Sequence, residues 1–172
     1  MFGNYRKGLI GGMKKSYWWF IFLIFVVYIV LLTKFVLFKY HTPLDAIQQF
    51  SMTFSKEQLE RQNFTLFETI KLFWNTTVLS NQVKFNNLGL NIIGFMPFGF
   101  FIPLLFSSKR NMIKMILLTF FFSFSYEIIQ FFCEVGSFDV DDLFLNTIGG
   151  FLGYILFKVL YCLKYFYEKR RV

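Results

Sequence analysis

Carboxylate and carboxamide side chains lie beside apolar runs at three places in the chain, and their types suit cation binding or proton transfer. The groups are Asn91, then Glu127 and Gln130, then Asp139, Asp141, Asp142 and Asn146. Carboxylate oxygens are ligands for hard cations, and two carboxyl groups can act together as acid and base. The spacing alone favours neither chemistry over simple binding. We assign no catalytic residue, no metal ligands and no cofactor.

Other catalytic arrangements find little support in the sequence. The single histidine, His41, lies outside these groups, so neither a histidine-based nucleophilic triad nor a multi-histidine metal site is available. No G-x-S-x-G, H-E-x-x-H or G-x-x-x-x-G-K-[ST] motif occurs. The polar groups are therefore the only candidates for chemistry that the sequence offers.

The elements that must position these groups are predicted to be transmembrane helices. The chain is 56% hydrophobic and 16% charged, whereas charged residues make up about a quarter of soluble domains. Crossing a bilayer takes roughly 20 apolar residues, and such segments occur at 17–38, 88–106, 112–133 and 143–163. We expect an all-α integral membrane protein, a single domain built as a bundle of about four transmembrane helices.

Two further observations support this interpretation. The net charge of +8 does not indicate a nucleic acid partner, because the basic residues lie beside apolar runs and not along one stripe. The first segment is longer than the core of a signal peptide and lacks an A-x-A-like cleavage site, so we expect an uncleaved helix.

The distribution of Lys and Arg predicts the orientation, because short cytoplasmic loops are enriched in these residues. They are found in the N-terminal tail, the connection between the second and third segments, and the C-terminal tail, but not at 134–142, which is acidic. We therefore expect both termini in the cytoplasm, and the connections 39–87 and 134–142 outside. In this orientation all three polar groups lie in one outer layer.

Helical spacing predicts that the polar side chains face the bundle interior. Ser123, Glu127 and Gln130 recur on one helix face, and a carboxylate facing lipid is unfavourable. On the last helix, one face contains Asp142, Asn146, Gly149 and Gly153. The two glycines form a small-xxx-small surface for close packing.

A simpler interpretation is that the aspartates only cap the last helix. Asp139 or Asp141, with Asp142, could satisfy its first N–H groups and complement its dipole. Capping does not explain Glu127, which lies near a helix C-terminus.

Further features concern packing, the outer connection and the two cysteines. Pro97 and Pro103 are expected to kink the second helix, where Pro97 and Gly99 are packing positions. Residues 39–87 are long for a loop without structure, and Ser55 to Gln58 matches a capping box. The apolar stretch 66–74 is too short to span, so it is expected to form an interfacial helix or lid, or only to support folding. Cys133 and Cys162 should lie at opposite ends of the bundle as free thiols.

The polar groups and their surroundings resemble the VanZ-like membrane family. The matching stretches are Asn91-Ile-Ile-Gly-Phe-Met-Pro97-Phe-Gly99, Glu127-Ile-Ile-Gln130, and Asp139-Val-Asp141-Asp142 followed by Asn146 and Gly149. In the outer connection, Asn63-Phe-Thr-Leu-Phe-Glu-Thr-Ile70 is similar to the family's N-L-x-P-F-x-T-I stretch. The resemblance covers residues 61 to 160, and the combination of stretches is more specific than any one of them.

Three positions depart from the family pattern. Leu66 stands where the family often has Pro, and Leu90 where a Gly often precedes the asparagine. Gly136 stands about where many members carry an arginine. If that arginine contacts a counter-ion or an anion, this chain lacks it or uses Arg61 from the outer connection.

The resemblance implies a protein of the bacterial cytoplasmic membrane associated with reduced susceptibility to teicoplanin-type lipoglycopeptide antibiotics. We interpret the seven polar residues named first, with Arg61 and Asn63, as an outward-facing acidic pocket among membrane lipids. Its ligand would be the antibiotic or a lipid-linked cell-wall precursor. One alternative is an intramembrane enzyme that modifies an envelope lipid or peptidoglycan precursor with Glu127 and Asp142. Another is a structural or partner-binding subunit.

Overall fold

Long helices dominate the structure, which is a computed structural model that describes residues 15–38, 42–50, 55–76, 80–106 and 111–170. Four helices are long and apolar enough to span a membrane. They are α1 (Lys15–Leu37), α5 (Asn81–Leu105, apolar from Asn87), α6 (Met112–Cys133) and α7 (Val140–Lys169). The chain is thus an all-α membrane protein with four candidate spans close to the segments expected from the sequence.

The greatest difference from the expected boundaries is in α7, which starts at Val140 and continues to Lys169. At about 1.5 Å rise per residue, this 30-residue helix is longer than a bilayer core of about 30 Å. Its last turns carry an ion pair between Lys164 and Glu168, 3.7 Å apart. Such polar turns keep helical geometry beyond the apolar segment.

The closest packing in the bundle is between α5 and α7, which share the most extensive contact. A Cβ added to Gly153 would overlap the carbonyl oxygen of Met96, and one added to Gly149 would overlap that of Ile92. From α5, Gly99 meets the carbonyl oxygen of Gly150 in the same way. The two backbones therefore touch where glycine leaves room, as small-xxx-small surfaces allow.

Aromatic and aliphatic side chains fill the space between these helices and α1 and α6. One buried cluster consists of Leu32, Leu37, Phe95 and Tyr126, and a second of Phe98, Ile102, Met115 and Tyr154. The rings of Phe98 and Phe122 stack at 4.5 Å between centroids. Helix α5 continues through Pro97 and Pro103, and Pro103 is fully buried.

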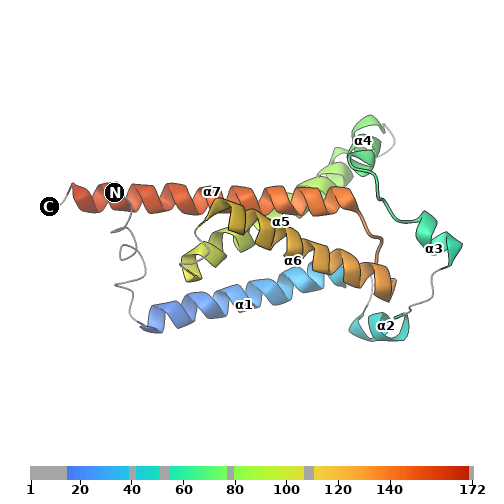
Figure 1. Cartoon of the computed structure of the whole chain (residues 1–172), viewed down its shortest axis with the longest axis horizontal. Coiled ribbons are helices and arrows are strands. Elements are labelled where there is room, and N and C mark those ends of the chain that lie inside the picture. Colours follow the sequence, from blue (N-terminus) through green and yellow to red (C-terminus); the bar gives the residue numbers. More distant parts are fainter. Residues whose placement is uncertain (1–14, 39–41, 51–54, 77–79, 107–110, 171–172) are drawn as a thin grey trace.

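The outer connection contains three short helices, α2 (Pro43–Gln48), α3 (Lys56–Glu60) and α4 (Glu68–Asn75). All three lie at the end of the bundle where α1 and α6 finish and α5 and α7 begin (Figure 1). We call this the α4 end. The expectation that this connection has structure of its own is confirmed for its described residues.

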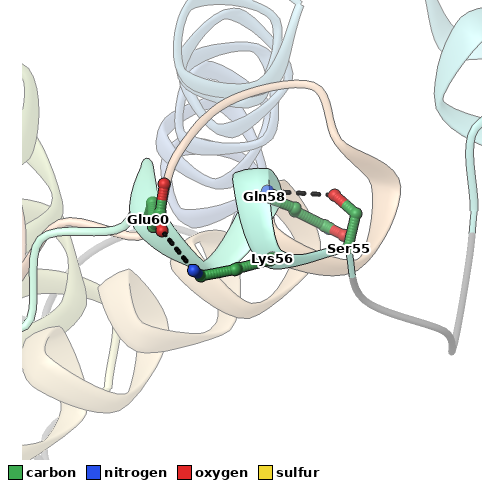
Figure 2. Close-up of polar contacts among 4 residues, drawn as sticks. All are labelled: Ser55, Lys56, Gln58 and Glu60. Atoms are coloured by element: carbon green, nitrogen blue, oxygen red, sulfur yellow. Dashed lines mark hydrogen bonds and ion pairs between the residues drawn. The ribbon is translucent and has the colours of Figure 1, made fainter.

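The N-cap expected at Ser55 is confirmed, whereas the Gln58 side chain bonds to α6 and not back to Ser55 as in a capping box. The hydroxyl of Ser55 accepts a hydrogen bond from the Gln58 amide nitrogen at 3.1 Å, and Lys56 pairs with Glu60 at 3.7 Å (Figure 2). The side-chain amide of Gln58 donates to the carbonyl oxygen of Phe131 in α6 at 3.1 Å. This bond attaches α3 to the end of a membrane-spanning helix.

The exposed residues of α4 suit the membrane interface. Leu72 and Trp74 are 65% and 80% exposed. An amphipathic helix with exposed Trp and Leu is typical of the boundary between head groups and acyl chains. Helix α4 also contacts α5 and α7, so it covers the α4 end while presenting apolar side chains outward.

Candidate functional site

A cavity of about 300 Å³ lies at the α4 end, between helices that are distant in sequence. Its polar lining consists of Thr69, Asn87, Asn91, Glu127, Gln130, Ser137, Asp139, Asp142 and Asn146. Phe35, Val36, Phe73, Leu88, Val135 and Gly136 complete the wall. The lining includes three carboxylates and, among the described residues, no Lys, Arg or His. Acids that line a cavity attract a positively charged occupant.

The start of α7 is built around Asp139, which caps the helix. Its Oδ1 accepts from the amide nitrogen of Asp141 at 2.8 Å and from Asn63 Nδ2 at 2.9 Å. Its Oδ2 accepts from the hydroxyl of Thr69 at 2.7 Å. Asn63 and Asp139 also pair in a short parallel bridge. The Asn63 amide nitrogen donates to the Phe138 carbonyl oxygen at 2.9 Å, and the Val140 amide nitrogen donates to the Asn63 carbonyl oxygen at 3.1 Å. Asp139 therefore joins α7 to the outer connection.

Glu127 reaches the same place from α6. It is only 2% exposed, and its Oε2 accepts from the amide nitrogen of Asp139 at 2.9 Å. Asp139 and Asp142 line the same cavity as Glu127. Ser123, one turn earlier on the same face, is fully buried. Burying a carboxyl group inside a membrane bundle is energetically unfavourable, so its presence here favours a functional role.

Asp141 has a different role from its neighbours. It is fully buried, and its two carboxylate oxygens accept from the amide nitrogens of Phe67 and Ile70, the latter at 3.0 Å. These are N–H groups at the start of α4, where Phe67 has a positive φ of 68° and gives no side-chain cap. Asp141 thus caps α4 from another helix, and it does not line the cavity.

Three side chains complete the polar layer around the cavity. The amide of Asn91 on α5 donates to Asp142 Oδ1 on α7. Gln130 donates to the carbonyl oxygen of Val36 at the end of α1, at 3.1 Å. Asn146 Nδ2 donates to Ser123 Oγ at 2.8 Å. Every membrane-spanning helix thus contributes to this layer.

The structure therefore brings most of the residues singled out in the sequence to one place, with three exceptions. Asn63 contacts Asp139 but does not line the cavity. Asp141 is fully buried against the start of α4 and does not line the cavity either. Arg61 is exposed at the C-terminal cap of α3 and does not line the cavity. The suggestion that Arg61 supplies a positive charge to the pocket is not supported by this position.

Several lining residues were not selected from the sequence. Thr69 lies within the stretch that resembles the family, and its position six residues after Asn63 was the available signal. Phe73 lies on the cavity side of α4, and Phe35 and Val36 at the end of α1. Nothing in their residue types distinguishes them from the many other apolar residues of the chain.

The arrangement is best suited to holding a polar or cationic group. Both oxygens of Asp139 and of Asp141 accept hydrogen bonds from the protein. Glu127, Asp139, Asp142 and Asn146 line the cavity. No group of three or more His, Cys, Asp or Glu within the described ranges is placed to hold a metal ion. The apolar wall from α1 and α4 lies next to the acids.

Comparisons with known proteins show which family the chain belongs to. The VanZ/LLP1 family model matches residues 25–161. Protein VanZ of Enterococcus faecium is 34% identical over 83 residues, which are 48% of this chain and 51% of that protein. The chain thus spans about half the length of this curated relative. No solved structure gives a significant match. Because the family model covers most of the chain, the protein belongs to the VanZ/LLP1 family.

Proposed function

We propose that the protein lowers susceptibility to teicoplanin-type lipoglycopeptides by binding a polar or cationic head group in the cavity at the α4 end. The observation that carries this proposal is a cavity of about 300 Å³ with three carboxylates and, in its described lining, no basic side chain. The family resemblance suggests the resistance role.

The cavity must face outward to meet such a ligand. The acidic connection at 134–142 and the enrichment of Lys and Arg at the other end of the bundle favour that orientation. The apolar wall formed by Phe35, Val36, Phe73 and Leu88 would lie toward the acyl chains. The ligand is then either the lipid-anchored antibiotic or a lipid-linked envelope component.

Binding accounts for the geometry better than catalysis by Glu127 and Asp142. An acid/base pair needs carboxyl oxygens within reach of a substrate proton. Glu127 is instead held by the Asp139 amide nitrogen, and Asp142 by Asn91. These hydrogen bonds hold the carboxylates of Glu127 and Asp142 in the lining of the cavity.

The test is an inhibitory concentration measured in a teicoplanin-susceptible Gram-positive host. The strains express wild type, Glu127→Ala or Asp142→Ala, with Glu57→Ala as a control that removes an exposed carboxylate far from the cavity. Membrane levels must be equal by immunoblotting. Wild type and Glu57→Ala should raise the inhibitory concentration, and the two cavity variants should not.

Each other result has a clear meaning. If wild type gives no protection, the resistance role does not apply to this chain. If Glu127→Ala and Asp142→Ala protect as well as wild type, the cavity is not the binding site and the acids are structural.

A further inference from the structure

Among the described residues, Asn146 Oδ1 is the one fully buried side-chain nitrogen or oxygen without a hydrogen-bond partner. Asn146 is 3% exposed and lines the cavity. Its Nδ2 donates to Ser123 Oγ at 2.8 Å, and its Oδ1 has no hydrogen-bond partner. Buried acceptors in native proteins are almost always satisfied. This oxygen therefore marks a place where a donor from outside the chain belongs.

The surroundings of this oxygen select the charge of the donor. Glu127 and Asp142 line the same cavity, and Glu127 is 98% buried. Acids that line a cavity attract a positively charged occupant. An occupant that donates hydrogen bonds and carries a positive charge both satisfies the oxygen and is attracted by the acids.

We propose that the cavity binds a protonated primary amine, which donates to Asn146 Oδ1 and lies against the carboxylates of Glu127 and Asp142. This rests on the proposed function and narrows the head group to one chemical class. A primary ammonium carries three N–H donors, as the Lys side chain does. A quaternary ammonium has the same charge and no donor, so it leaves Asn146 unsatisfied.

The cavity fits an amine with its carbon chain better than a bare ion. Both oxygens of the remaining acid, Asp139, already accept hydrogen bonds from the protein. A volume of about 300 Å³ is some ten times the share of one water molecule in the liquid, about 30 Å³. The apolar wall containing Phe35, Phe73 and Leu88 offers contacts for methylene groups.

The test compares two cations of equal charge and chain length on the full-length protein in phosphatidylcholine nanodiscs. Hexylamine, protonated at pH 7 because alkyl amines titrate near 10, and hexyltrimethylammonium are titrated calorimetrically, and the signal from empty nanodiscs is subtracted. We expect saturable hexylamine binding at least tenfold tighter than hexyltrimethylammonium binding, which corresponds to about 1.4 kcal/mol.

Two variants test whether Asn146 causes the preference for hexylamine over hexyltrimethylammonium. Asn146→Leu removes the acceptor with little change in volume and should abolish the tenfold preference. Thr147→Val is the matched control, because the neighbouring hydroxyl bonds only to the Leu143 carbonyl oxygen of its own helix and does not line the cavity. It should keep the preference. Melting temperatures show whether both variants fold. If Asn146→Leu does not fold, the comparison of the two cations on wild type still tests the inference.

Equal affinity for the two cations would overturn the inference, because the cavity would then respond to charge alone. No saturable binding of either cation would also overturn it. These failures differ from failure of the resistance role. Protection that depends on Glu127 without amine binding leaves the proposed function with another ligand, and amine binding without protection removes the proposed function alone.

Discussion

Asp139, Asp141 and Asp142 lie within four positions of each other and bind three different sets of partners. Asp139 caps its own helix and holds Asn63 and Thr69, while Asp142 faces the cavity and binds Asn91. Asp141 caps α4 from outside. At the start of a helix, successive side chains point in different directions. The three aspartates of one short segment therefore contact α7, α4 and the cavity.

Replacing Asp141 should therefore loosen α4. In Asp141→Asn one of the two acceptor oxygens becomes an NH2 group that opposes an amide N–H, and loss of an N-cap costs about 1–2 kcal/mol. We expect hydrogen exchange of the α4 amides, including Ile70, to become roughly ten times faster, since 1.4 kcal/mol is a factor of ten. Mass spectrometry of peptides covering 66–76 measures this.

Asp142→Asn is the matched control for that experiment, since it makes the same chemical change one residue away. Asp142 accepts a hydrogen bond from Asn91 on α5, whereas the partners of Asp141 are amides at the start of α4. Exchange in α4 should stay as in wild type. Equal acceleration in both variants would show that α4 responds to the general charge of this segment and not to the cap.

The sequence predicted that these residues would lie together, but not what each one does. Topology and helical spacing place Glu127, Asp142 and Asn146 in the same layer, because both depend only on position along a helix. The choice of Asp141 as the cap of α4 depends on where Phe67 and Ile70 lie after folding. No local pattern near residue 141 carries that information.

At the scale of elements, the bundle depends on the contact between α5 and α7. The glycines of α7 lie against carbonyl groups of α5, so even one methyl group would push the helices apart. Gly153→Ala should destabilise the protein by about 1–3 kcal/mol, the usual cost of overpacking. The thermal unfolding midpoint in detergent measures the effect.

Gly94→Ala distinguishes crowding from a general effect of replacing glycine. A Cβ at Gly94 would lie 3.6 Å from Cδ1 of Leu32, which is ordinary van der Waals contact. This variant should unfold at or slightly above the wild-type temperature, since Ala favours helices over Gly by about 1 kcal/mol. A drop as large as that of Gly153→Ala would contradict the packing argument.

The long helices could be predicted because the length of an apolar segment is a local property of the sequence. Helix α3 could also be predicted, because its N-cap residue Ser55 directly precedes it in the sequence. The start of α4 could not, because Phe67 has no capping side chain. The length of α7 was also underestimated, since its polar last turns remain helical without being apolar.

At the scale of the whole molecule, the orientation in the membrane decides what the cavity can meet. In a background with Cys133→Ser and Cys162→Ser, Glu57→Cys and Lys169→Cys place single thiols on exposed residues at opposite ends of the bundle. The distribution of basic residues predicts that a membrane-impermeant maleimide labels Glu57→Cys in intact cells. Lys169→Cys should react only after permeabilisation, and the reverse pattern would place the cavity on the cytoplasmic side.

The cap that Asp141 gives to α4 also sets an order of assembly. The ribosome makes residues 56–76 before residues 139–142, yet Asn63, Phe67 and Ile70 find their partners in that later segment. The outer connection can reach its final fold only after the last helix has entered the bilayer. Until then α4 has no cap and Asn63 has no bridge. A chain stalled before Asp139 would leave this segment unprotected, so its resistance to cleavage by an added protease reports whether a molecule has been completed.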